Sequence, residues 1–219
     1  MTAIPRTRTR SLSERYPDRI IIGLTGNIAV GKSLVLGLLA QLGAAVIDAD
    51  EVAHQVLRRG GAAYAPVLAA FGHGILGADG EIARGKLGAI VFADPAQLRR
   101  LEAITHPAIR LEIDRRIRGA ASSVVVIEAI KLLEGDLKNA VDAVWVVDAA
   151  PETQRRRLMA ERGMSRVEAQ RRIRVQNSQA DKLRQADVVI ANDGDLAATR
   201  AQVERAWAAL RATRQSNQP

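Results

Sequence analysis

The chain has 219 residues, of which 47% are hydrophobic and only 3% aromatic, so aliphatic side chains must fill a core of one-domain size. Its formal net charge is +8 and it contains no cysteine, which favours anionic ligands and excludes disulfides and thiolate chemistry. No signal peptide is visible, no apolar stretch approaches the roughly 18 residues of a membrane span, and aromatic residues are too few for a base-stacking surface. These features predict a cytoplasmic protein and argue against a membrane or nucleic-acid partner.

The first 19 residues are polar and rich in arginine, which predicts a disordered basic extension, with an arm that contacts nucleic acid as the alternative. An apolar strand pattern follows over residues 20–24, and an apolar helical pattern begins at Lys32. The segment between the strand and the helix gives the first indication of function.

This segment reads Gly-Asn-Ile-Ala-Val-Gly-Lys-Ser over residues 26–33, which is the P-loop pattern in the strand-to-helix setting that it requires. The backbone N–H groups of such a loop surround a phosphate, and the dipole of the following helix favours an anion. Lys32 can then reach the β- and γ-phosphates, and the Ser33 hydroxyl can bind Mg²⁺. A glycine-rich turn that binds nothing would leave both side chains unexplained. We therefore predict a nucleotide-phosphate site made of Asn27, Ile28, Ala29, Val30, Gly31, Lys32, Ser33 and Leu34.

The remainder of the chain alternates strand and helix patterns around one strand-poor segment. Apolar strands are expected at 44–47, 124–127, 144–147 and 188–190, and their continuous apolar character is typical of a parallel sheet covered on both faces. Residues 62–118 instead predict short helices and one long helix from Pro95, disturbed at His106-Pro107. We expect an α/β fold with a parallel sheet core, a helical insertion, and a helix pair opened by Pro151 and by a capping box at Ser165.

The order and spacing of several short segments resemble the dephospho-CoA kinase family over about residues 20–208. The segments are 23–33, 46–50, 71–72, 79–84, 91–92, 101–107, 132–134 and 186–192. The resemblance implies a P-loop kinase domain over 20–214, with a helical CoA-binding lobe at 62–118, a small lid at 151–180 and a tail at 215–219. It implies transfer of the γ-phosphoryl group of ATP, with Mg²⁺, to the ribose 3′-hydroxyl of dephospho-CoA by a monomer or weak oligomer.

The resemblance also assigns roles to acidic residues after the second strand. Asp50 matches the family's catalytic base, which would orient the ribose hydroxyl and accept its proton. Asp48 would help to hold Mg²⁺ through water, since two residues spaced by two in an extended chain face the same way. The alternative is that Asp50 only caps the helix that begins at Glu51.

Basic and polar residues elsewhere match further family positions. Arg157 and Arg162 would stabilise charge on the transferred phosphoryl group, although a solvated helix face explains most arginines of this region. Asn192 would meet the adenine or would be only a turn residue. In the helical lobe, Arg84 is expected to bind a phosphate of dephospho-CoA, and His106 to bind substrate or to organise a helix break.

The chain departs from the family pattern at two places. In the loop, Asn27, Ala29, Val30 and Leu34 replace Gly, Gly, Ser and Thr, which retains the phosphate cradle and stiffens the loop at Ala29. In the segment 128–134 a lysine, Lys131, stands where the family usually has proline, and it either contacts a nucleotide phosphate or points to solvent. Another small-molecule or nucleoside-monophosphate kinase and a nucleotide-dependent binding switch remain as alternatives, although no Asn-Lys-x-Asp guanine signature is present.

Overall fold

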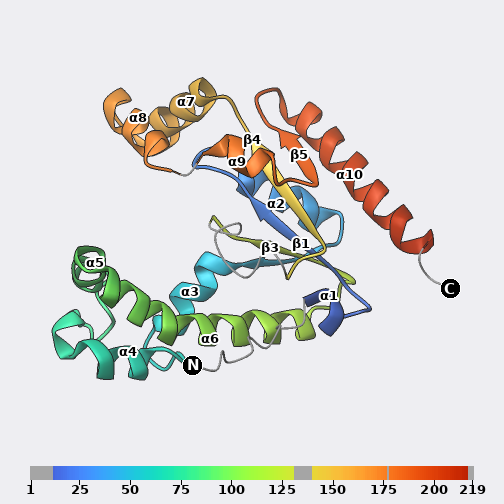
Figure 1. Ribbon diagram of the computed structural model, residues 1–219. Coiled ribbons are helices and arrows are strands. Elements are labelled where there is room, and N and C mark those ends of the chain that lie inside the picture. Colours follow the sequence, from blue (N-terminus) through green and yellow to red (C-terminus); the bar gives the residue numbers. More distant parts are fainter. Residues whose placement is uncertain (1–11, 131–139, 177, 217–219) are drawn as a thin grey trace, which may run out of the picture. The chain divides into compact units, whose positions relative to one another are not determined.

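A computed structural model describes residues 12–130, 140–176 and 178–216 of the chain (Figure 1). The chain divides into two compact units, one made of residues 1–46 and 121–219 and the other of Ile47–Ala120. The elements in chain order are α1 (Leu12–Arg15), β1 (Ile20–Thr25), α2 (Lys32–Gln41), β2 (Ala45–Asp48), α3 (Ala49–Leu57), α4 (Tyr64–Phe71), η1 (His73–Ile75), α5 (Arg84–Ala93), α6 (Pro95–Gly119), β3 (Val124–Glu128), β4 (Ala143–Asp148), α7 (Pro151–Arg162), α8 (Arg166–Arg174), α9 (Gln179–Leu183), β5 (Val188–Ala191) and α10 (Leu196–Ser216).

A five-stranded sheet with the strand order β2-β3-β1-β4-β5 carries the architecture. The pairings of β1 with β3, of β1 with β4 and of β4 with β5 are parallel. The central strands consist mainly of valine and isoleucine, whose branched side chains suit a pleated surface buried on both faces. The predicted α/β fold with a parallel sheet is therefore confirmed.

One face of the sheet packs against α2 and α10, and these helices also contact each other (Figure 1). Alternate residues of each strand, such as Ile22 and Leu24 in β1, point into this layer and are fully buried. Trp145 and Trp207 supply the only indole rings of the chain, and both are buried in the same layer. This packing fixes the start of α2, and with it the end of the loop that precedes the helix.

Local capping signals set the ends of the helices that follow β4. Gly163 ends α7 in the left-handed conformation with φ 61°, which glycine adopts without strain. Ser165 then begins α8 with a capping box, in which its side chain accepts from the Glu168 N–H and the Glu168 side chain accepts from the Ser165 N–H. The short link between these caps places α7 and α8 side by side (Figure 1).

The second unit, Ile47–Ala120, is helical and is organised by α6, which contacts α3, α4 and α5. Asp94 caps α6 through the Ala96 N–H at 2.7 Å, and Pro95 occupies the first turn, where its missing N–H costs nothing. The disturbance expected at His106-Pro107 is absent from the helix assignment, because α6 continues through Pro107 to Gly119. Packing against three other elements compensates for the hydrogen bond that Pro107 cannot donate.

The N-terminal region also differs from the prediction of a disordered extension over residues 1–19. Leu12–Arg15 forms the short helix α1, the Leu12 side chain is buried, and the Leu12 N–H donates to the Ala140 carbonyl at 2.9 Å. Arg19 donates to the Ser122 carbonyl at 2.7 Å. The polar composition hid the buried contact of this single leucine, while residues 1–11 lie outside the described part.

At the other end α10 extends to Ser216, beyond the expected end of the kinase domain at 214. None of the helices that the structure describes is long and apolar enough to cross a membrane.

Candidate functional site

The carboxyl ends of β1, β4 and β5 meet at one edge of the sheet. Thr25 at the end of β1 is paired with Val146 of β4, and Asp148 at the end of β4 is paired with Ala191 of β5. Ligands of open parallel sheets bind at such an edge. The segment 26–31 leaves β1 at this point and leads into the N-terminus of α2, so the loop lies where strand ends and helix dipole both favour an anion.

Close contacts explain why the loop needs glycine at both ends. A Cβ atom on Gly26 would stand 2.5 Å from the Val147 carbonyl oxygen, and one on Gly31 would stand 2.0 Å from the Asn192 side-chain nitrogen. Gly31 also has φ 94°, a conformation that disfavours any residue with a side chain. Both glycines of the predicted P-loop are thus required by the fold around the loop.

The Lys32 side chain folds back over the loop that precedes it. Its Nζ donates to the Gly26 carbonyl at 3.1 Å and to the Asn27 carbonyl at 3.4 Å, and it forms an ion pair with Glu128 at 3.7 Å. The Lys32 and Glu128 side chains are each only 12% exposed, so the loss of water strengthens their attraction. Lys32 is therefore held over the loop by protein contacts, while Ser33 and Leu34 beside it are exposed.

Arg157 and Asn192 hold the middle of the loop from the other side. The Arg157 guanidinium donates to the Ala29 carbonyl at 3.1 Å and to the Asn192 carbonyl at 2.7 Å. The buried Asn192 side chain donates to the Val30 carbonyl at 2.8 Å and accepts from the Thr199 hydroxyl at 2.9 Å. Two carbonyls of the loop, those of Ala29 and Val30, thus accept hydrogen bonds from side chains outside the loop.

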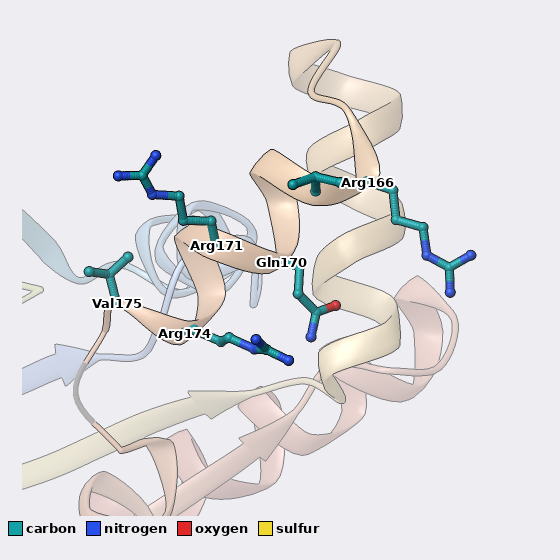
Figure 2. A pocket seen from close by; sticks show the side chains of 6 residues that line it. Arg166, Gln170, Arg171, Arg174 and Val175 are labelled. Carbon is teal, nitrogen blue, oxygen red and sulfur yellow. The ribbon is translucent and has the colours of Figure 1, made fainter.

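Helix α8 provides a basic, open pocket of about 550 Å³ in the same unit (Figure 2). Its lining consists of Arg166, Val167, Gln170, Arg171, Arg174 and Val175. The Ser165 backbone N–H and hydroxyl donate to Glu168 and lower the pKa of this carboxyl. Three arginines, Arg166, Arg171 and Arg174, give this lining a positive charge that suits an anion.

Comparison with known proteins decides the family. The family model described as dephospho-CoA kinase matches residues 20–198. A dephospho-CoA kinase of Symbiobacterium thermophilum is 47% identical over 192 residues, which cover 86% of this chain and 80% of the relative.

This chain belongs to the dephospho-CoA kinase family.

Solved structures agree with this assignment. The crystal structure of TT1252 from Thermus thermophilus matches with a TM-score of 0.76 and 33% identity, over 89% of this chain and 97% of that one. A dephospho-CoA kinase from Campylobacter jejuni matches with a TM-score of 0.63 and 27% identity, over 87% of this chain and 96% of that one. The family resemblance drawn from the sequence is thereby confirmed.

The acidic pair expected at the catalytic centre of the family is arranged differently from the prediction. Asp48 ends β2 and caps α3, because its side chain accepts from the Glu51 N–H at 2.9 Å. Asp50 lies inside the first turn of α3 and is half-buried. The two residues therefore do not face the same way along an extended chain. The alternative in which Asp50 caps a helix starting at Glu51 is also wrong, since α3 begins at Ala49 and the cap is Asp48.

The predicted substrate residues of the helical unit lie on two of its helices. Arg84 is the first residue of α5 and is exposed. His106 is exposed in the middle of α6, where it accompanies no break. Both remain candidates for substrate binding. Lys131 lies outside the described residues.

Among the predicted nucleotide residues, the structure brings Lys32, Arg157 and Asn192 to the loop and leaves Arg162 exposed in the last turn of α7. It also adds Glu128, Gln176 and Gln179, which the sequence analysis did not select. Glu128 had a signal, because it ends an apolar strand in the sheet that carries the loop. The glutamines had none, since they are uncharged and belong to no motif.

Proposed function

We propose that this protein transfers the γ-phosphoryl group of ATP to the ribose 3′-hydroxyl of dephospho-CoA, giving CoA and ADP as the last step of CoA biosynthesis. The observation that carries the proposal is the family match over residues 20–198 together with a P-loop whose lysine and glycines are held in place. The expected partner is the small molecule dephospho-CoA, and the expected setting is the cytoplasm.

The proposed reaction is an in-line displacement at phosphorus. The ribose oxygen forms a bond to the γ-phosphorus while the bond from that phosphorus to the β-γ bridging oxygen breaks. Asp50 orients the hydroxyl and accepts its proton, which a carboxylate within hydrogen-bond reach can do. ADP leaves with the electron pair of the broken bond, and Lys32 and Arg162 stabilise the negative charge on the phosphates.

Mg²⁺ fits the donor set of this proposal. The candidate ligands are the Ser33 hydroxyl, which is exposed at the start of α2, and the Asp48 carboxylate, of which Oδ1 serves the cap of α3. Among the described residues no group of three or more His, Cys, Asp or Glu side chains forms a metal cage. Mg²⁺ is typically bound by one or two protein oxygens together with phosphates and water, and here it would neutralise phosphate charge.

The decisive assay incubates the protein with ATP, Mg²⁺ and dephospho-CoA and follows CoA by mass spectrometry and ADP by a coupled reaction. We expect equimolar CoA and ADP. A panel of nucleoside monophosphates and other alcohols, tested at the same concentrations, separates this function from that of another small-molecule kinase. Folded protein that binds ATP and leaves dephospho-CoA unchanged would refute the proposal. Size-exclusion chromatography checks the expectation of a monomer or weak oligomer.

Asp50→Asn tests the proposed base. We expect kcat to fall by about 10²–10⁴-fold, the range for loss of general base catalysis, with the dissociation constant for ATP unchanged. Asp94→Asn is the matched control, because Asp94 caps α6 in the same unit through the Ala96 N–H and asparagine caps a helix about as well as aspartate. Turnover of the Asp50 variant close to that of the wild type would remove this residue from the base role.

A further inference from the structure

Two glutamine side chains occupy the start of the phosphate loop. Gln176 Oε1 accepts from the Ile28 N–H at 2.7 Å, and Gln179 Oε1 accepts from the Asn27 N–H at 3.2 Å. Both glutamines are half-buried. They come from the segment that links α8 to β5, about 150 residues away in the chain. Loop N–H groups that a phosphate-binding protein needs are therefore already paired with protein oxygens.

The other end of Gln179 is also fixed. Its Nε2 donates to the Val147 carbonyl at 3.0 Å and to Asp148 Oδ1 at 2.9 Å. One side chain thus joins the loop to the end of β4 and uses its amide oxygen and its amide nitrogen for this purpose. Asp148 is the last residue of β4. This strand end lies close to the loop, because a Cβ on Gly26 would be in contact with the Val147 carbonyl.

The backbone of Gln179 is held as firmly as its side chain. Gln179 is the first residue of α9, and the Ser178 side chain caps this helix through the Asp181 N–H. Lys182 in the same helix is buried, with its Nζ donating to the Ile130 carbonyl at 3.3 Å. These contacts hold α9 and place the side-chain amide of Gln179 between the loop and β4. The side chain therefore has little rotamer entropy left to lose when a ligand binds.

We propose that Gln179 is a positioning residue that holds the phosphate loop and the Asp148 carboxylate in a fixed relation, so that the loop is preformed for the phosphates of ATP. In this arrangement the glutamine stays in place when ATP binds. The phosphates are bound by N–H groups farther along the loop, toward Gly31 and Ser33, and by Lys32. The inference rests on the proposed ATP-dependent function and adds a residue to the machinery of that site.

The opposite possibility is that the glutamine oxygen stands in for phosphate and must leave. The two possibilities predict opposite signs for one measurement. If Gln179 preforms the loop, its removal weakens ATP binding, because the loop must then be ordered by the ligand. If Gln179 occludes the loop, its removal strengthens ATP binding, because a competitor is lost. The contacts of Nε2 favour the first, since displacement of the oxygen would strain an amide bound at its other end.

The test compares Gln179→Met with the wild type in the full-length protein. Methionine keeps the length of the side chain and removes both donor and acceptor. We expect the dissociation constant of ATP, measured by isothermal titration calorimetry, and the KM for ATP to rise about tenfold, with kcat changed less than about threefold. A purely structural role would instead lower the active fraction, and therefore kcat, at constant KM. Gln185→Met, an exposed position after α9, is the control.

Gln179→Glu keeps the oxygen that accepts from Asn27 and loses the donor to Asp148, so it separates the two ends of the link. We expect it to weaken ATP binding at least as much as the methionine variant, because two carboxylates then face each other. ATP affinity unchanged or increased in both variants would overturn the inference. This readout needs no acceptor, so it remains decisive even if the wild type fails to phosphorylate dephospho-CoA.

Discussion

Ala29 has a backbone conformation that alanine rarely adopts. Its φ is 57°, and among the described residues it is the only one other than glycine with a positive φ. The left-handed region costs a residue with a Cβ about 1–2 kcal/mol. The Arg157 hydrogen bond to the Ala29 carbonyl helps to hold this residue, so the strain is maintained by contacts from outside the loop.

Ala29→Gly should therefore stabilise the protein. We expect the free energy of unfolding to rise by about 0.5–1 kcal/mol, because relief of the left-handed strain exceeds the extra freedom that glycine gives to the unfolded chain. Urea denaturation followed by circular dichroism measures this change. Ala40→Gly in the regular helix α2 is the control and should destabilise by a similar amount. Equal destabilisation by both substitutions would show that position 29 carries no strain.

The loop also shows how much of the candidate site could be predicted from residue types alone. Gly31 and Lys32 were sufficient to predict a phosphate loop. The backbone conformation of such a loop requires glycine, and the charge of the phosphates requires lysine. Ala29 was expected to stiffen the loop, and the structure adds that its φ is positive. The sequence could not show this, because the conformation depends on Arg157, which lies 128 residues away.

At the scale of single elements, α6 and α3 are joined by a polar network. Glu112 on α6 accepts from Arg115 and Arg116, and Arg116 donates to Gln55 on α3. The hydrogen bonds from the two arginines lower the pKa of Glu112 from 4.5 to about 2. Glu112, whose side chain is only 21% exposed, therefore holds Arg116, and Arg116 makes the contact to α3.

Stability should consequently depend on the charge of Glu112. A carboxyl group whose pKa is lower in the folded state stabilises the protein above its unfolded pKa, and this contribution is lost as the pH falls from 4.5 to about 2. Glu112→Gln should cost about 1–2 kcal/mol at pH 7, and the difference from the wild type should vanish toward pH 2. Urea denaturation at a series of pH values measures this, with Glu102→Gln on the same helix as control. A difference independent of pH would contradict it.

The ends of helices were predicted correctly where the local sequence carries a strong capping pattern. The capping box of Ser165 and Glu168 and the stop at Gly163 were predicted and are present, because each involves neighbours in the chain. Pro107 was expected to disturb its helix and does not, since tertiary packing outweighs one missing hydrogen bond. Helix α3 begins at Ala49, two residues earlier than expected. The reason is that Asp48 is both the last residue of β2 and a good helix cap.

At the scale of the whole molecule, the N-terminal segment is part of the folded protein from Leu12 onward. The Leu12 side chain is 8% exposed, and α1 contacts β1. A backbone hydrogen bond to Ala140 ties the same residue to the region before β4. The segment before the sheet therefore contributes to the unit that holds the phosphate loop.

Leu12→Ala should destabilise that unit. We expect a loss of about 2 kcal/mol, the lower end for truncation of a buried leucine, because α1 is short and its surroundings can partly relax. Thermal unfolding with and without ATP measures this loss. Leu111→Ala, at a position that is 63% exposed, is the control and should change stability little. Equal stability of both variants would mean that α1 does not contribute to folding.

The residues that contact the loop from distant parts of the chain could not be predicted from the sequence. Gln179 and Asn192 reach the loop only because β1, β4 and β5 are neighbours in the sheet, and that strand order cannot be read from local patterns. Arg157 had been selected for its charge, and its observed contacts are backbone carbonyls. The alternation of strand and helix patterns predicted the fold class, while the roles of Asp50, Arg84 and His106 stay predictions.

The division of the chain has a consequence for how such proteins diversify. The helical unit, Ile47–Ala120, is one uninterrupted stretch that begins at the end of β2 and finishes before β3, and these two strands are neighbours in the sheet. The other unit contains every contact of the phosphate loop described above. Substitutions within the helical unit therefore leave every described contact of the phosphate loop in place, so the two units can vary in sequence separately.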